Sequence, residues 1–166
     1  ALPFGESVRL IVGETRLIVA AESRLDALAW ASGAPQWSAT MAGTATPLVA
    51  DGRVFAAADG HIAALSEVTG HVEWRWPAAG VTAPLAYRAG WLFVITADGN
   101  VTGLRAADGA PQWTASHPPA RLAAPLTVDG DGLFGVFDDG SLVAWQVSTG
   151  QVRWTTQVAP RPGQIL

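Results

Sequence analysis

Few residues in this chain of 166 have types and spacings that could support chemistry. Its three histidines, His61, His71 and His117, lie ten and forty-six residues apart, which matches no zinc-binding spacing. The chain has no cysteine, and this excludes disulfides, thiolate metal ligands and cysteine nucleophiles. No Gly-x-Ser-x-Gly elbow offers a serine nucleophile. The sequence therefore predicts no catalytic residue and no metal site.

Two motifs match known patterns only as text. The stretch GDGLFG, Gly130 to Gly135, fits the dinucleotide fingerprint, but that fingerprint needs a following helix to hold the pyrophosphate. It aligns instead with DGRVFA at residues 51–56, so we expect a hairpin and no bound cofactor. Asn100-Val101-Thr102 is a glycosylation sequon, which has meaning only in a eukaryotic secretory pathway. The arginine-only, alanine-rich composition is more typical of a GC-rich bacterium.

Composition and charge predict a compact globular protein. Apolar residues make up 49% of the chain and charged residues 14%. Ten arginines, no lysine and fourteen acids give a net charge of −4, so we expect no nucleic-acid partner. The sequence contains no run of eighteen apolar residues, so it predicts no transmembrane segment. Its opening ALPFGES lacks the features of a signal peptide. Because the chain does not open with Met, we expect processing or excision from a longer chain.

A glycine followed four residues later by a tryptophan occurs four times. The pairs are Gly33 and Trp37, Gly70 and Trp74, Gly109 and Trp113, and Gly150 and Trp154. Successive pairs are 37, 39 and 41 residues apart, and the sequence between them also aligns. A fixed period of about forty residues indicates a repeat architecture. We therefore expect one domain, residues 1–166, built of repeats at about 8–40, 41–78, 79–117 and 118–158, with short terminal extensions.

Each repeat predicts four short antiparallel strands. Apolar runs of four to six residues alternate with glycine-containing turns, and no segment keeps a helical period. Seven of the nine aspartates precede a glycine, a pair that favours tight hairpins: Asp51, Asp59, Asp98, Asp108, Asp129, Asp131 and Asp139. Runs such as RVFAAA and WLFVIT do not alternate with polar residues, so both of their faces should be buried. The predicted fold is an all-β propeller of four four-stranded antiparallel blades.

The repeated Gly and Trp predict a clamp between neighbouring blades. The glycine would occupy a positive-φ turn after the third strand, and the tryptophan on the fourth strand would lie across the seam to the next blade. Four further tryptophans lie outside this pattern. Trp145 aligns with leucines in the other repeats and is expected in the core, whereas Trp30, Trp76 and Trp91 are candidates for binding a partner.

The repeats resemble the pyrroloquinoline-quinone-type propeller repeats, whose docking motif reads Ala-x-Asp-x-x-Thr-Gly-x-x-x-Trp. ALSEVTGHVEW supplies Ala64, Thr69, Gly70 and Trp74, and AWQVSTGQVRW supplies the same four residue types at positions 144–154. The first and third repeats are more degenerate. The aspartate of the motif is missing from all four repeats, which have Ala29, Ser66, Arg105 and Gln146 in its place.

The resemblance implies two functional classes. Quinone-dependent dehydrogenases of this kind need calcium ligands, a catalytic aspartate and usually a vicinal cysteine pair, and the cysteines are absent. The non-catalytic, BamB-like branch binds other proteins. We expect a non-enzymatic scaffold for protein or peptide partners, with no cofactor, in the bacterial periplasm or cell envelope. The alternatives are a fragment of a quinone-dependent dehydrogenase and an extracytoplasmic ligand-sensing domain.

Four blades leave the closure of the propeller open, because propellers of the resembled family are usually eight-bladed. The chain could form a closed four-bladed ring, half of an eight-bladed ring completed by a second copy, or an open fragment of a longer propeller. An unclosed stack would expose two apolar blade faces. We therefore expect self-association, most simply two copies related by a two-fold axis.

Overall fold

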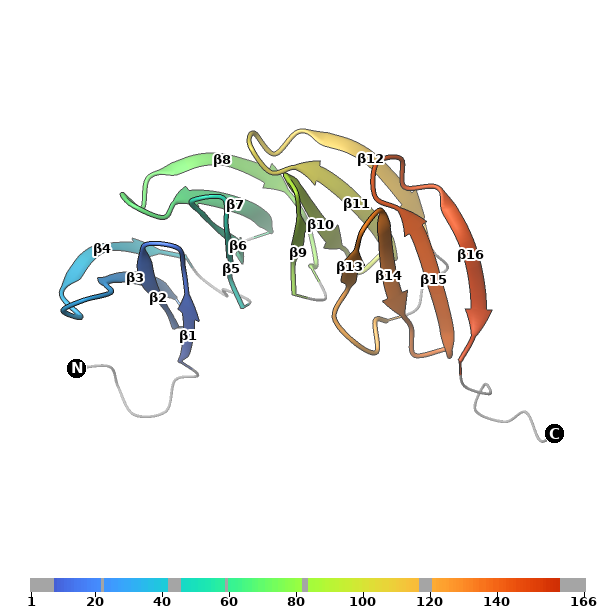
Figure 1. The fold of residues 1–166 in the computed structure, drawn as a ribbon, viewed down its shortest axis with the longest axis horizontal. Coiled ribbons are helices and arrows are strands. Elements are labelled where there is room, and N and C mark those ends of the chain that lie inside the picture. Colours follow the sequence, from blue (N-terminus) through green and yellow to red (C-terminus); the bar gives the residue numbers. More distant parts are fainter. Residues whose placement is uncertain are drawn as a thin grey trace. The chain divides into compact units, whose positions relative to one another are not determined.

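A computed structural model describes residues 8–21, 23–41, 46–58, 60–81, 84–116 and 121–158. Within these ranges, sixteen strands form four antiparallel sheets of four strands each (Figure 1). In every sheet the strands lie side by side in chain order, so each sheet is an antiparallel meander whose successive strands are connected by hairpins. The described part of the chain contains no helix that is long and apolar enough to span a membrane. The all-β, four-stranded repeats predicted from the sequence are confirmed.

Each sheet is one blade and contains one repeat. Blade 1 comprises β1 (Arg9–Val12), β2 (Arg16–Ala21), β3 (Arg24–Ala29) and β4 (Pro35–Thr40). Blade 2 comprises β5 (Leu48–Ala50), β6 (Arg53–Ala58), β7 (His61–Ser66) and β8 (Val72–Pro77). Blade 3 comprises β9 (Ala86–Arg88), β10 (Trp91–Ile95), β11 (Asn100–Arg105) and β12 (Pro111–Ser116). Blade 4 comprises β13 (Thr127–Asp129), β14 (Gly132–Val136), β15 (Ser141–Gln146) and β16 (Val152–Gln157).

Asp-Gly pairs close the hairpins, as their residue types predict. Asp51 and Gly52 both have positive φ angles, 51° and 66°, which is the geometry of a type I′ turn. The glycine also has positive φ in the other Asp-Gly pairs except one. The exception is Gly132, which follows Asp131 and already begins β14, because Gly130 makes the preceding turn with φ 56°. Asp59 lies outside the described residues.

The turn between the third and fourth strands has the same backbone in all four blades. Its glycine has a φ between 67° and 72° and donates its N–H, at 2.8 Å, to the carbonyl four residues earlier. These pairs are Gly33 and Ala29, Gly70 and Ser66, Gly109 and Arg105, and Gly150 and Gln146. A β-bulge interrupts the pairing of the third and fourth strands just before each turn. Backbone hydrogen bonds therefore build this turn regardless of the side chain at the aspartate position of the motif.

The chain divides into two compact units, Ala1–Ala78 and Ala79–Leu166. In the first unit, Ile18 and Leu25 of blade 1 pack against Val54 and Leu65 of blade 2, and all four are fully buried. Because β6 faces blade 1 on one side, its small residues Ala56 to Ala58 allow close packing, and the strand is buried from its second residue onward.

The second unit has its own core between blades 3 and 4. Phe93 and Val101 of blade 3 pack with Leu133 and Trp145 of blade 4. Trp145 is buried, and its ring lies edge-on to that of Phe137, with centroids 6.1 Å apart. The predicted core position of this tryptophan is therefore observed. β10, in the stretch WLFVIT, is buried from its second residue onward.

Candidate functional site

The most specific side-chain contact in the first unit is the seam between blades 1 and 2. Trp37 of β4 lies over the turn of blade 2, and its Nε1 donates a hydrogen bond to the Glu67 carbonyl oxygen at 2.8 Å. A Cβ atom added to Gly70 would lie 2.6 Å from the Trp37 ring. The glycine is thus required twice, by its φ of 72° and by the aromatic ring that covers it.

The second unit repeats this contact between blades 3 and 4. Trp113 Nε1 donates to the Val147 carbonyl oxygen at 2.7 Å, and a Cβ atom on Gly150 would overlap the Trp113 ring. In both seams the acceptor carbonyl belongs to the residue three positions before the glycine. The indole therefore recognises the backbone of the turn, with one hydrogen bond and one flat contact.

The tryptophans of blades 2 and 4 have the same local support. Trp74 is half-buried with its ring 5.9 Å from Phe55, and Trp154 lies 6.0 Å from Phe134. Both pairs have the tilted geometry of Phe93 and Trp113. Trp154 nevertheless remains 44% exposed.

A buried carboxylate, which the sequence reasoning missed, strengthens the first seam. Glu67 of blade 2 is fully buried, and its Oε1 accepts the backbone N–H groups of Thr15 at 2.6 Å and Arg16 at 2.8 Å. The hydroxyl of Thr15 donates to the same oxygen at 3.1 Å. Gly13 leaves room for it, because a Cβ atom there would lie 2.5 Å from Glu67 Oε1. The signal in the sequence was an acid at a position where the other repeats have Trp30, Ala106 and Val147.

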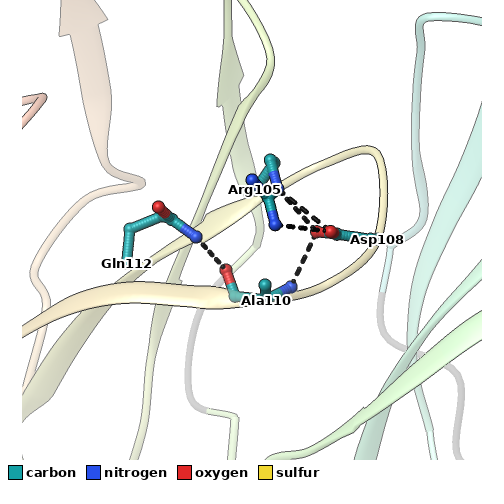
Figure 2. A network of polar contacts seen from close by, with 4 residues as sticks. All are labelled: Arg105, Asp108, Ala110 and Gln112. Atoms are coloured by element: carbon teal, nitrogen blue, oxygen red, sulfur yellow. Dashed lines mark hydrogen bonds and ion pairs between the residues drawn. The ribbon is translucent and has the colours of Figure 1, made fainter.

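The third repeat replaces the motif's polar pair with an ion pair (Figure 2). Arg105 occupies the aspartate position and Asp108 the threonine position, and the Arg105 Nη2 atom lies 2.6 Å from Asp108 Oδ2. Asp108 Oδ1 also accepts the Ala110 N–H at 3.1 Å. The Arg105 hydrogen bond, followed by that from Ala110, lowers the pKa of Asp108 below its ordinary value. The Asp108 carboxylate thus supports the turn at neutral pH, and this support is lost as the pH falls through that lowered pKa.

Every blade has a side-chain oxygen at the equivalent position of this turn that accepts a backbone hydrogen bond. The side-chain oxygen of the residue before the glycine accepts the N–H group two residues further on, and these residues are Ser32, Thr69, Asp108 and Thr149. Serine, threonine and aspartate all close such local turns. The degenerate repeats therefore keep the hydrogen bond although they change the residue.

The remaining polar candidates take part in local structure. Asn100 donates from Nδ2 to Asp98 Oδ2 at 2.6 Å, and its Oδ1 accepts the Ser116 hydroxyl at 2.8 Å. Hydrogen bonds from Thr96, and then from the Asn100 backbone, lower the pKa of Asp98. The exposed His71 contributes its backbone to the turn of blade 2. His61 is exposed at the start of β7, and His117 lies outside the described residues. Residues 130–135 form part of the β13–β14 hairpin, as expected.

The three tryptophans proposed for partner binding have different surroundings. Trp30 is 59% exposed in the turn of blade 1. Trp76 is half-buried on β8, on the same side of the strand as Trp74. Trp91 is half-buried at the start of β10, where it stacks on Phe93 at 6.3 Å and packs against the core of the second unit. Trp30 and Trp76 belong to the first unit, and Trp91 belongs to the second.

The family described as outer membrane protein assembly factor BamB matches residues 3–87 and 21–165, which together cover nearly the whole chain. The chain belongs to this BamB family. No protein with a curated description matches it significantly. The predicted kinship with pyrroloquinoline-quinone-type propeller repeats is thereby confirmed.

Solved structures similar to this BamB-family chain include BamB from Moraxella catarrhalis. That structure is 22% identical with a TM-score of 0.71, and the match covers 88% of this chain and 51% of the other. A quinohemoprotein alcohol dehydrogenase from Pseudomonas putida is 16% identical with a TM-score of 0.70, over 91% of this chain and 34% of the other. The computationally designed Ika4 protein is 15% identical with a TM-score of 0.75, over 87% of this chain and 94% of the other.

At these identities the structural matches establish the propeller fold alone. The chain spans about half the length of the Moraxella BamB structure and nearly the whole length of Ika4. A set of four such blades is therefore found both as part of a longer chain and as almost an entire chain.

The double requirement for Gly70 predicts an unequal pair of alanine substitutions. Gly52→Ala adds a Cβ atom in open space at a φ of 66°, so it should cost only about 1 to 2 kcal/mol of backbone strain. Gly70→Ala has the same strain and also displaces the Trp37 ring, which should add about 1 to 3 kcal/mol. Urea unfolding followed by circular dichroism measures both costs. Equal losses would contradict the role given to the indole.

Removing the buried carboxylate should be more costly than removing an exposed one on the same blade. Glu67→Ala leaves the N–H groups of Thr15 and Arg16 without their acceptor, so we expect a loss of about 2 to 4 kcal/mol in the free energy of unfolding. Glu73→Ala removes a more accessible ion pair with Arg53 and should cost at most about 1 kcal/mol. Chemical denaturation of the two variants tests this, and a Glu67→Ala loss no larger than that of Glu73→Ala would refute it.

Proposed function

We propose that this chain is a non-enzymatic propeller scaffold that binds protein or peptide partners in the bacterial periplasm or cell envelope. The proposal is supported by membership of a family described as an outer membrane protein assembly factor. It is also supported by the way the chain uses its polar residues. The binding surface then consists of strand edges and exposed aromatic side chains.

The observation that carries the proposal is that acidic side chains form hydrogen bonds and ion pairs within the fold. Asp98, Asp108 and Asp139 accept hydrogen bonds within their own hairpins. Asp26 pairs with Arg24, and Asp131 pairs with Arg153. Among the described residues, no three His, Cys, Asp or Glu side chains gather where they could hold a metal ion. Carboxylates used in this way are poorly placed to act as general acids or bases.

A quinone-dependent dehydrogenase would need a site for its quinone and for calcium. Calcium requires several carboxylate, amide or carbonyl oxygens converging on one point. The single asparagine, Asn100, already bonds Asp98 and Ser116, and the chain has no cysteine to lie against the quinone. The described residues therefore do not fit this cofactor.

The fourth strand of each blade is the surface best suited to a partner. β4, β8, β12 and β16 are edge strands that pair only with the third strand of their own sheet. In β4 and β12, exposed polar residues alternate with half-buried ones. An open edge of this kind can accept an added strand from a peptide, with backbone hydrogen bonds providing affinity. Exposed Trp30 supplies an additional aromatic contact.

A crosslinking experiment tests the strand edge. A photoreactive amino acid in place of Gln112, which is exposed on β12, should give discrete adducts with other envelope proteins in the source cells. The same amino acid at Ala107, which is exposed in the β11–β12 turn of the same blade, is the matched control and should give markedly less. Equal labelling at both positions, or adducts with the chain itself alone, would argue against partner binding at this edge.

A dehydrogenase is the second candidate, because a quinohemoprotein alcohol dehydrogenase shares the fold. The test is a titration with pyrroloquinoline quinone and Ca²⁺, followed through the fluorescence of the eight tryptophans. We expect only the weak, linear quenching of an absorbing solute. Saturable quenching at micromolar quinone that depends on Ca²⁺ would reverse the choice between the two functions.

A further inference from the structure

Blade 1 presents an uncovered apolar face. In the first unit, blade 2 contacts blade 1 through Val54 and Leu65, which form a cross-strand pair and are fully buried. The same pair in blade 1 is Leu17 and Leu28, and both are only half-buried. Val12, next to them on β1, is exposed. We call this surface, together with the turn of residues 30–33, the leading face.

Blade 4 presents the complementary uncovered face. Blade 1 contacts blade 2 through Ile18 and Trp37, which flank Ala27 on β2 and β4. Their equivalents in blade 4 are Phe134 and Trp154, which flank Ala144. Phe134 is half-buried, and Val152, Trp154 and Val158 are exposed. We call this surface the trailing face.

The two faces carry the two halves of the seam contact described above. Trp154 is held by Phe134 in the geometry that Phe93 gives Trp113, although Trp113 also has the Val147 carbonyl as acceptor. Gly33 has the positive φ of Gly70 and Gly150, yet a Cβ atom added to it would meet no atom within 4 Å. The residue three positions before it, which supplies the acceptor carbonyl in the other seams, is Trp30.

We propose that the trailing face of one copy of this chain docks on the leading face of a second copy. Trp154 of one copy covers Gly33 of the other and donates its Nε1 hydrogen bond to the Trp30 carbonyl. Two copies exchange this contact in both directions, so that both pairs of faces are covered around a two-fold axis.

The choice of a second copy as the occupant rests on the seams inside the chain. Both observed seams join a tryptophan of one repeat to the turn of another repeat of the same type, and blades 4 and 1 hold one such half each. Large apolar faces are seldom left open to water.

Light scattering on the purified chain tests the proposal with a matched pair of glycines. The wild-type chain should have twice the 17.2 kDa mass of one chain. Gly33→Ala places a methyl group where the indole of the second copy must lie, so this variant should have the single-chain mass. Gly52→Ala adds the same strain, at a φ of 66° and away from both faces, and should keep the doubled mass.

A third variant tests the other half of the contact. Trp154→Ala should also reduce the mass to that of one chain, with the far-ultraviolet circular dichroism of the folded protein retained. A wild-type chain that stays monomeric at high concentration would overturn the proposal and assign the faces to another occupant, such as further blades of the same polypeptide. Equal masses for Gly33→Ala and Gly52→Ala would overturn it as well. A mass that grows beyond two chains with concentration would refute the closed pair.

Discussion

The contact between an indole ring and a left-handed glycine is the constraint on which each described seam depends. Trp37 and Trp113 each cover a glycine turn of the following blade and donate to a backbone carbonyl beside it. Any side chain on that glycine would force the ring away, and a phenylalanine in place of the tryptophan would lose the hydrogen bond. One glycine and one tryptophan per repeat are therefore the residues that the chain preserves while others change.

Because the indole recognises backbone atoms, the rest of the motif can vary. The aspartate position holds alanine, serine, arginine and glutamine in the four repeats. The glycine N–H still bonds the carbonyl at that position in every blade. In blade 3 an arginine and an aspartate replace the usual acid and threonine, and they form an ion pair across the same turn. The turn thus tolerates an arginine at the aspartate position of the motif when an aspartate stands at the threonine position.

This use of polar residues also shapes the proposed function. Short hairpins need acceptors close to their own backbone, and Asp98, Asp108 and Asp139 fill that need. The buried carboxylate of Glu67 in blade 2 accepts two backbone N–H groups of blade 1 and so joins the two blades. The proposed function therefore uses strand edges, which can pair with the backbone of another polypeptide.

The sequence by itself determined the repeat, the four strands of each blade, the hairpins and the pairing of glycine with tryptophan. These follow from local rules, because turn residues and strand lengths act over a few neighbouring positions. Tertiary structure alone decided which carbonyl accepts each indole and that Glu67 reaches Arg16 at the end of the β1–β2 turn, 51 residues away. It also decided that Trp91 packs against the core of its unit whereas Trp30 is exposed. The contacts of the indoles and of Glu67 join separate blades, and equivalent repeat positions become buried or exposed according to whether a neighbouring blade covers them.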